Sequence, residues 1–124
     1  ASQVLPYMEK SRQSKDQQIL SSLCTDITSA IAQSGESCTG GSAALTSLAT
    51  IANDKTTAEL QSLRSDKTLA QINTESSGAL GSKLMKGKSI CVEVNNSNGK
   101  IAVWAGAVGS KPAAGSKNLV ENEQ

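Results

Sequence analysis

The chain begins with two stretches whose hydrophobic patterning differs sharply. Residues 9–18 contain no apolar side chain, yet nearly all of them form helices well or neutrally. From residue 19, apolar residues recur at steps of three and four, which places them on one stripe of a helix. We predict one long helix within residues 1–33, continuous from about Pro6. Its predicted buried stripe consists of Leu20, Leu23, Cys24, Ile27 and Ile31.

The first half of this helix has no apolar stripe with which to face a core. We therefore expect a solvated rod there, with Arg12, Lys15 and Gln18 exposed. Pro6 suits the first turn of a helix, and it would produce a kink if the helix continued upstream. Gly35 can end the helix in the left-handed C-cap conformation.

Residues 34–89 form a variable region of helices and loops. A small-residue loop from Gly35 to Ser42 precedes a predicted short helix over 43–52, whose apolar face is Leu45, Leu48 and Ile51. A further helix is predicted from Ala58 to about Asn73, and Thr56 and Glu59 have the spacing of a capping box. Residues 78–87 fit either a helical turn or an irregular lead into a strand.

The clearest β signal lies in residues 90–124. Ile90, Val92 and Val94 alternate with other residues, and the turn that follows contains Asn98-Gly99, the strongest short hairpin dipeptide. The return strand is predicted over 100–108. An isolated hairpin is marginal in water, so helices must cover it or a third strand must join it. The candidate third strand is 117–120, and a polar tail follows.

These elements predict an α+β fold in a single domain over residues 1–124. A long N-terminal helix over 1–33 packs on a small antiparallel sheet, the C-terminal hairpin and tail occupy 90–124, and additional short helices lie between. The core must be thin, because the aromatic residues are one Tyr and one Trp without any Phe. The Trp is expected to cap this core or to lie in a subunit contact.

Charge and composition give no indication of a nucleic-acid partner or of an anionic membrane surface. The net charge is +1, and no Lys/Arg run forms a phosphate-binding patch. The chain has no His, and its eleven acids are scattered without a paired constellation. General acid–base and nucleophilic catalysis depend on such groups, so we expect no enzyme and no cofactor or metal.

The three cysteines lack the CxxC spacing of a metal or redox site. They allow one disulfide with one free thiol, or three unpaired thiols. Cys24 shares the predicted inward stripe, where cysteine usually acts as a small core hydrophobe. If a bridge forms, Cys38 with Cys91 is preferred, because Cys38 lies in a loop and Cys91 alternates with Ile90 and Val92.

The order of elements resembles that of type IV pilins and pseudopilins. The resemblance is strongest from Val4 to Asp16, where an apolar residue and Pro6 lead into a polar stretch rich in Lys, Arg and Ser. In that family, a similar junction ends the hydrophobic half of the helix that forms the filament core. The chain departs from many Gram-negative pilins because no cysteine follows Cys91 to close a C-terminal loop. This departure favours a small pilin of a Gram-positive or otherwise divergent organism.

The resemblance implies a structural subunit of an extracellular filament that acts by polymerisation, in adhesion, motility or uptake. It implies self-association through an apolar helix half upstream, an export and assembly machinery, and membrane anchoring before assembly. We therefore expect the sequence to be a fragment of a longer protein. The alternatives are a secretion pseudopilin, a minor pilin with an adhesin-like binding head, and a small cytosolic helical regulator.

Overall fold

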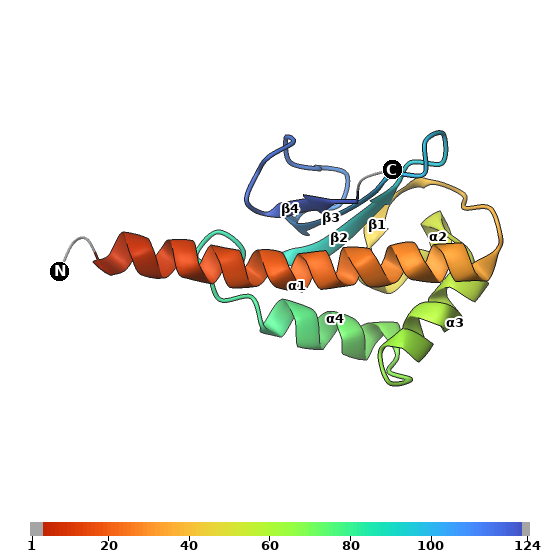
Figure 1. Cartoon of the computed structure of the whole chain (residues 1–124), viewed down its shortest axis with the longest axis horizontal. Helices are drawn as coiled ribbons and strands as arrows, with labels where there is room; N and C mark the ends of the chain where they lie inside the picture. The colour runs from red at the N-terminus through yellow and green to blue at the C-terminus, as the bar shows by residue number, and fades with distance from the viewer. Residues whose placement is uncertain (1–3, 123–124) are drawn as a thin grey trace.

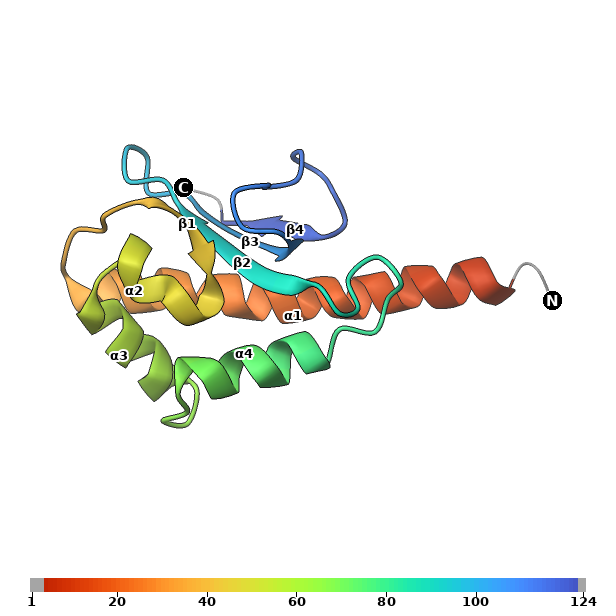
Figure 2. The ribbon, with the colours of Figure 1, turned by 180° about the vertical axis from the view of Figure 1, so that it is seen from behind.

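A computed structural model describes residues 4–122, and the fold is α+β as predicted. The long helix α1 (Val4–Ser34) runs along the molecule. A four-stranded antiparallel sheet lies on one side of it, and the helices α3 (Asp54–Leu63) and α4 (Leu69–Gly78) lie on the other (Figures 1 and 2). At the N-terminal end, α1 extends past the sheet and past the other helices (Figure 2).

Helix α1 is continuous and includes the predicted span from Pro6 to Gln33. At about 1.5 Å per residue, its 31 residues span about 46 Å. Leu20, Leu23 and Ile27 are completely buried, so the predicted apolar stripe faces the core. Gly35 follows with a φ of 66°, in the left-handed region, as expected for the residue that ends a helix.

The sheet has the order β1-β2-β3-β4, and every neighbouring pair is antiparallel. Its strands are β1 (Gly41–Ala44), β2 (Ser89–Val94), β3 (Ile101–Gly106) and β4 (Leu119–Glu121). The predicted hairpin is β2–β3, with Gly99 at a φ of 75° in its turn, and the candidate third strand is β4. Strand β1 was not predicted, because Gly-Ser-Ala-Ala has no residue with a strong strand preference.

The two faces of the sheet pack against different layers. The inner face carries Ile90, Val92 and Val103 into the main core beneath α1. The outer face carries a small second cluster of Cys91, Ala102, Trp104 and Leu119. Trp104 is fully buried there, and its indole Nε1 donates a hydrogen bond to the Ala107 carbonyl oxygen at 3.0 Å. Trp104 therefore anchors a second layer, formed by the β3–β4 loop, on the outer face.

The short helices differ from the predicted ones in their bounds. The predicted helix over 43–52 is instead strand β1, the 3₁₀ turn η1 (Leu45–Ser47) and the single turn α2 (Leu48–Ile51). Pairing with β2 draws residues 41–44 into the sheet. Leu45, Leu48 and Ile51 are nevertheless buried, so the predicted apolar residues are correct. The single helix predicted to contain them is wrong.

The predicted helix over 58–73 is two helices, α3 (Asp54–Leu63) and α4 (Leu69–Gly78). They are separated by a turn in which Ser65 and Asp66 have φ values of 59° and 60°. The predicted capping box at Thr56 is wrong: the Asn53 side chain caps α3, and the capping box is formed by Thr68 and Gln71 at the start of α4. Residues 81–87 form the turn that leads from α4 to β2.

Candidate functional site

The polar first half of α1 is not the free rod that its sequence predicts. Arg12, Lys15 and Gln18 are exposed as expected, but Asp16 in the same stretch is only 1% exposed. The turn over residues 81–87 crosses α1 (Figures 1 and 2), and its backbone binds the Asp16 carboxylate. The prediction failed because a turn that is 65 residues away in sequence supplies the contact.

The Asp16 carboxylate is the acceptor that holds this turn on the helix. Its Oδ1 accepts a hydrogen bond from the Gly81 backbone N–H at 3.0 Å. Its Oδ2 accepts from the Ser82 N–H at 2.9 Å and from the Ser82 hydroxyl at 2.6 Å. Ser82 is fully buried, and its hydroxyl oxygen in turn accepts from the Met85 N–H. A buried carboxylate is tolerated here because donors of the turn satisfy both of its oxygens.

Glu9 makes a second, exposed attachment two helical turns nearer the N-terminus. Its Oε1 accepts from the Lys83 N–H at 2.9 Å, and its Oε2 accepts from the Gln13 side chain at 2.7 Å. These hydrogen bonds, the backbone contact with Lys83 foremost, lower the pKa of the Glu9 carboxyl below its usual value. The two carboxylates together fix the turn to the helix between residues 9 and 16.

A sequence signal for this contact exists in the helical spacing. Asp16 lies four residues before Leu20 and seven before Leu23, so it continues the inward stripe by one turn. Glu9 lies a further seven residues upstream on the same side. A carboxylate in line with an apolar stripe is therefore a candidate for a buried acceptor rather than a solvated flank.

The structure places the predicted stripe residues on one side of α1 with one correction. Leu20, Leu23, Cys24 and Ile27 are buried, whereas Ile31 is only partly buried at the end of the core. The Cys24 thiol points toward the Ile101 carbonyl oxygen at 3.7 Å. The stripe is thus a packing surface between α1 and the sheet.

The preferred disulfide between Cys38 and Cys91 does not form, and all three cysteines are free. Cys91 belongs to the outer-face cluster with Trp104, while Cys38 packs against the main core on the opposite side of the sheet. Side chains alternate along β2, so Ile90 points to the inner face of the sheet and its neighbour Cys91 points to the outer face. Desolvation raises the pKa of each of the three thiols above its usual value, which disfavours the thiolate form.

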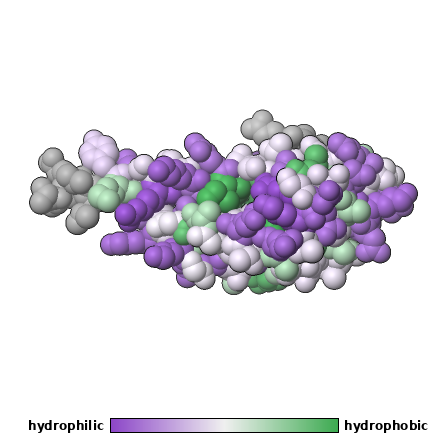
Figure 3. Space-filling model, turned by 90° about the horizontal axis from the view of Figure 1, so that it is seen from below, coloured by the Kyte–Doolittle hydropathy of each residue, from purple (hydrophilic) through white to green (hydrophobic). Residues whose placement is uncertain are grey.

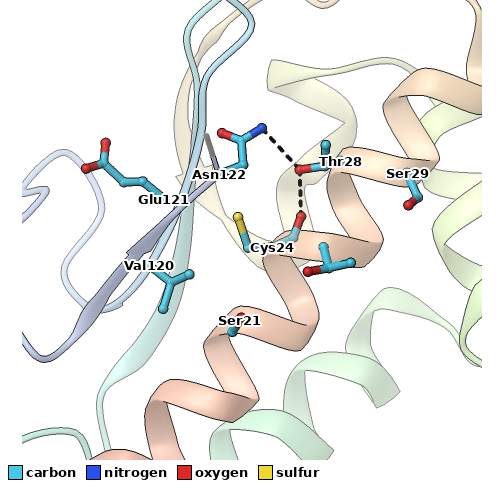
Figure 4. Close-up of a pocket in the computed structure, with 8 residues that line it drawn as sticks. Ser21, Cys24, Thr28, Ser29, Val120, Glu121 and Asn122 are labelled. Carbon is cyan, nitrogen blue, oxygen red and sulfur yellow. Dashed lines mark hydrogen bonds between the residues drawn. The ribbon is translucent and has the colours of Figure 1, made fainter. Parts of the chain in front are cut away.

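A groove of about 220 Å³ separates α1 from β4 (Figure 4). In it, the Asn122 amide donates to the Thr28 hydroxyl at 3.3 Å, and that hydroxyl donates to the Cys24 carbonyl oxygen at 2.7 Å. Glu121 points away from this chain of contacts (Figure 4). These two hydrogen bonds join Asn122, the residue directly after β4, to α1.

A second groove, of about 370 Å³, lies between the end of α1 and the hairpin turn, with Cys38, Glu36 and Asn95 among its lining residues. The Glu36 carboxylate is 3.3 Å from the Lys55 ammonium, and Asn95 Oδ1 accepts from Ser97. Within residues 4–122, no cluster of three or more Cys, Asp or Glu side chains could hold a metal ion. The same part of the chain contains no helix with the length and apolar character needed to cross a bilayer.

Comparison with known proteins gives no relative: no family model, no curated protein and no solved structure matches this chain.

Proposed function

We propose that the chain is the globular head of a subunit of a type IV pilus or a related extracellular filament, which acts by polymerisation and not by catalysis. The observation that best supports this proposal is the arrangement of α1. Its C-terminal half is built into the core, while its N-terminal end extends beyond the head (Figures 1 and 2). At that end, Tyr7 is 75% exposed.

A projecting helix suits a polymer only if it is held rigidly to its head. The Asp16 and Glu9 contacts with the turn over 81–87 supply that connection on the polar half, and the buried stripe supplies it on the other half. In the proposed mechanism, an apolar segment upstream of α1 anchors the subunit in the membrane and then packs in the filament core. Because helix and head form one body, that packing sets the orientation of every head on the filament surface.

The contacts of the polar groups also favour a structural role. In the groove of Figure 4, the Asn122 amide and the Thr28 hydroxyl bind each other, and desolvation raises the pKa of all three thiols. Catalysis by a thiol requires the thiolate, which a neighbouring cation or helix N-terminus normally stabilises.

The upstream sequence in the gene tests the proposal. We expect an apolar run of about 20 residues, the length that spans a bilayer, after a short charged leader. A protein that carries this native segment should remain in the membrane fraction of cells after a high-salt wash, whereas residues 1–124 alone, expressed in the same cells, should be released by that wash and serve as the control. A gene whose upstream sequence lacks the apolar run would overturn the proposal and favour the small cytosolic regulator.

A further inference from the structure

The fold divides the charges of the chain between two regions. Residues 7–18 of α1 and residues 81–88 of the turn, which the Asp16 and Glu9 contacts bring together, hold six cations and two acids, a net charge of +4. The other residues hold six cations and nine acids, a net charge of −3. The net charge of +1 conceals this separation, because the charges of the two regions largely cancel. Neither basic segment contains a run of basic residues that would reveal it in the sequence.

We call the six cations of this half of α1 and of the segment bound to it the basic collar. Its members are Lys10, Arg12, Lys15, Lys83, Lys86 and Lys88, and all six are exposed. Lys10, Arg12 and Lys15 point in different directions from the helix axis, and Lys83 adds its charge on the side of Glu9. On the face of the molecule drawn in Figure 3, hydrophilic side chains lie next to the N-terminal end.

The collar is not neutralised by acids of the described chain. Five of the other six cations form ion pairs, with Glu36, Asp26, Glu75, Glu93 and Glu121 as their partners. No collar residue forms such a pair with any residue in the described part of the chain. The carboxylates of the two acids within the region, Asp16 and Glu9, accept hydrogen bonds from backbone N–H groups of the turn. The Lys83 charge lies close enough to Glu9 to offset part of the charge on that carboxylate.

Exposed apolar side chains gather beside the collar. The large hydrophobic residues that remain most exposed in the described chain are Tyr7, Met8, Leu63, Leu84 and Val108. Tyr7 and Met8 precede the collar on α1, and Leu84 lies in the turn whose backbone contacts Glu9. Amphipathic aromatic rings beside basic residues are typical of the interface between a bilayer and water.

We propose that the collar and these apolar residues form a docking surface for an anionic lipid bilayer, with α1 directed into the membrane. Lys10 to Lys15 span about 8 Å along the helix axis, at about 1.5 Å per residue. The headgroup layer of one leaflet is about 5–8 Å thick, so the three collar residues on α1 fit within it. Tyr7 and Met8 then reach the boundary with the acyl chains. This inference concerns the chain itself and does not depend on filament formation.

Vesicle flotation of the 124-residue chain at low ionic strength tests the proposal. The probes are vesicles of phosphatidylcholine alone and vesicles in which one third of the lipid is phosphatidylglycerol. The chain should bind the anionic vesicles and be released by high salt, which screens exposed charges. Absence of binding, or equal binding to both vesicles, would overturn the proposal.

Two triple variants with the same net charge locate the surface. Lys83→Gln, Lys86→Gln and Lys88→Gln together should weaken binding to anionic vesicles by tenfold or more, since each basic residue near the surface contributes about 1 kcal/mol. The control is Lys55→Gln, Lys67→Gln and Lys117→Gln, outside the collar, which should change binding less than threefold. Equal weakening by both variants would mean that net charge alone acts, and would contradict the proposed surface.

The apolar contribution and the class of partner have their own controls. Tyr7→Ala should weaken vesicle binding several-fold, whereas Val108→Ala, at an exposed residue outside this surface, should not; equal effects would contradict the proposal.

A short DNA duplex in place of vesicles tests the competing partner. Binding to the duplex without binding to anionic vesicles would assign the collar to nucleic acid and overturn the lipid proposal.

Discussion

The change Asp16→Ala tests the contact between α1 and its turn most directly. Asp16 accepts three hydrogen bonds, two of them from the fully buried Ser82. The change leaves the Ser82 N–H and hydroxyl without that acceptor, and each buried unsatisfied donor costs about 1–3 kcal/mol. Gly81 is exposed, so its N–H can bind water. We expect a loss of about 3 kcal/mol in the free energy of unfolding.

Thermal unfolding by circular dichroism measures this loss. With an unfolding entropy of about 2.1 cal/mol/K per residue, 3 kcal/mol lowers the Tm of a 124-residue domain by about 12 °C. The control is Asp26→Ala on the same helix, which removes a partly exposed ion pair with Arg64 and should cost about 1 kcal/mol or less. A Tm for Asp16→Ala within 2 °C of the original, or equal to that of the control, would refute the reasoning.

Three further experiments test the core, the turn between α3 and α4, and the thiols. Leu23→Ala and Ile27→Ala, at fully buried positions, should each cost about 2–5 kcal/mol in chemical denaturation, and an unchanged midpoint in both would contradict the packing of α1. Asp66→Gly should stabilise the protein by about 0.5–1 kcal/mol, because glycine adopts a φ of 60° without strain; a lower Tm would show that the side chain matters more. At pH 8 in the folded protein, only Cys38 should react readily with a thiol reagent. Since burial raises the pKa of its thiol, the reaction rate should continue to rise at pH values where a free cysteine is already fully ionised. Denatured protein without reductant should show three thiols, and any smaller number would indicate a bridge.

The elements that the sequence predicted well are those whose apolar spacing extends over several residues. The helical spacing from Leu20 to Ile27 and the strand alternation from Ile90 to Val94 are both visible in the local sequence. Asn98-Gly99 specified the hairpin turn because its glycine supplies a positive φ. In these cases, local preference and tertiary packing favour the same structure.

The missed features depend on contacts between distant segments. Strand β1 exists because β2 pairs with it, and its own residues have weak strand preference. The break between α3 and α4 accompanies contacts of the Arg64 guanidinium with Asp26 and Ser22 on α1. The basic collar arises only when Gly81, Ser82 and Lys83 bind Asp16 and Glu9. The helical spacing marks these two carboxylates, but no local pattern identifies the segment that binds them.

Immunoelectron microscopy of cells that carry the full gene, with antibody raised against this chain, tests the filament proposal most directly. The account predicts labelling along the whole length of extracellular filaments, as expected for a major subunit. Deletion of the gene should remove both the filaments and the labelling. Labelling confined to tips or rare points would favour a minor or adhesive subunit over the major one. Cytosolic labelling without filaments would contradict the proposed function.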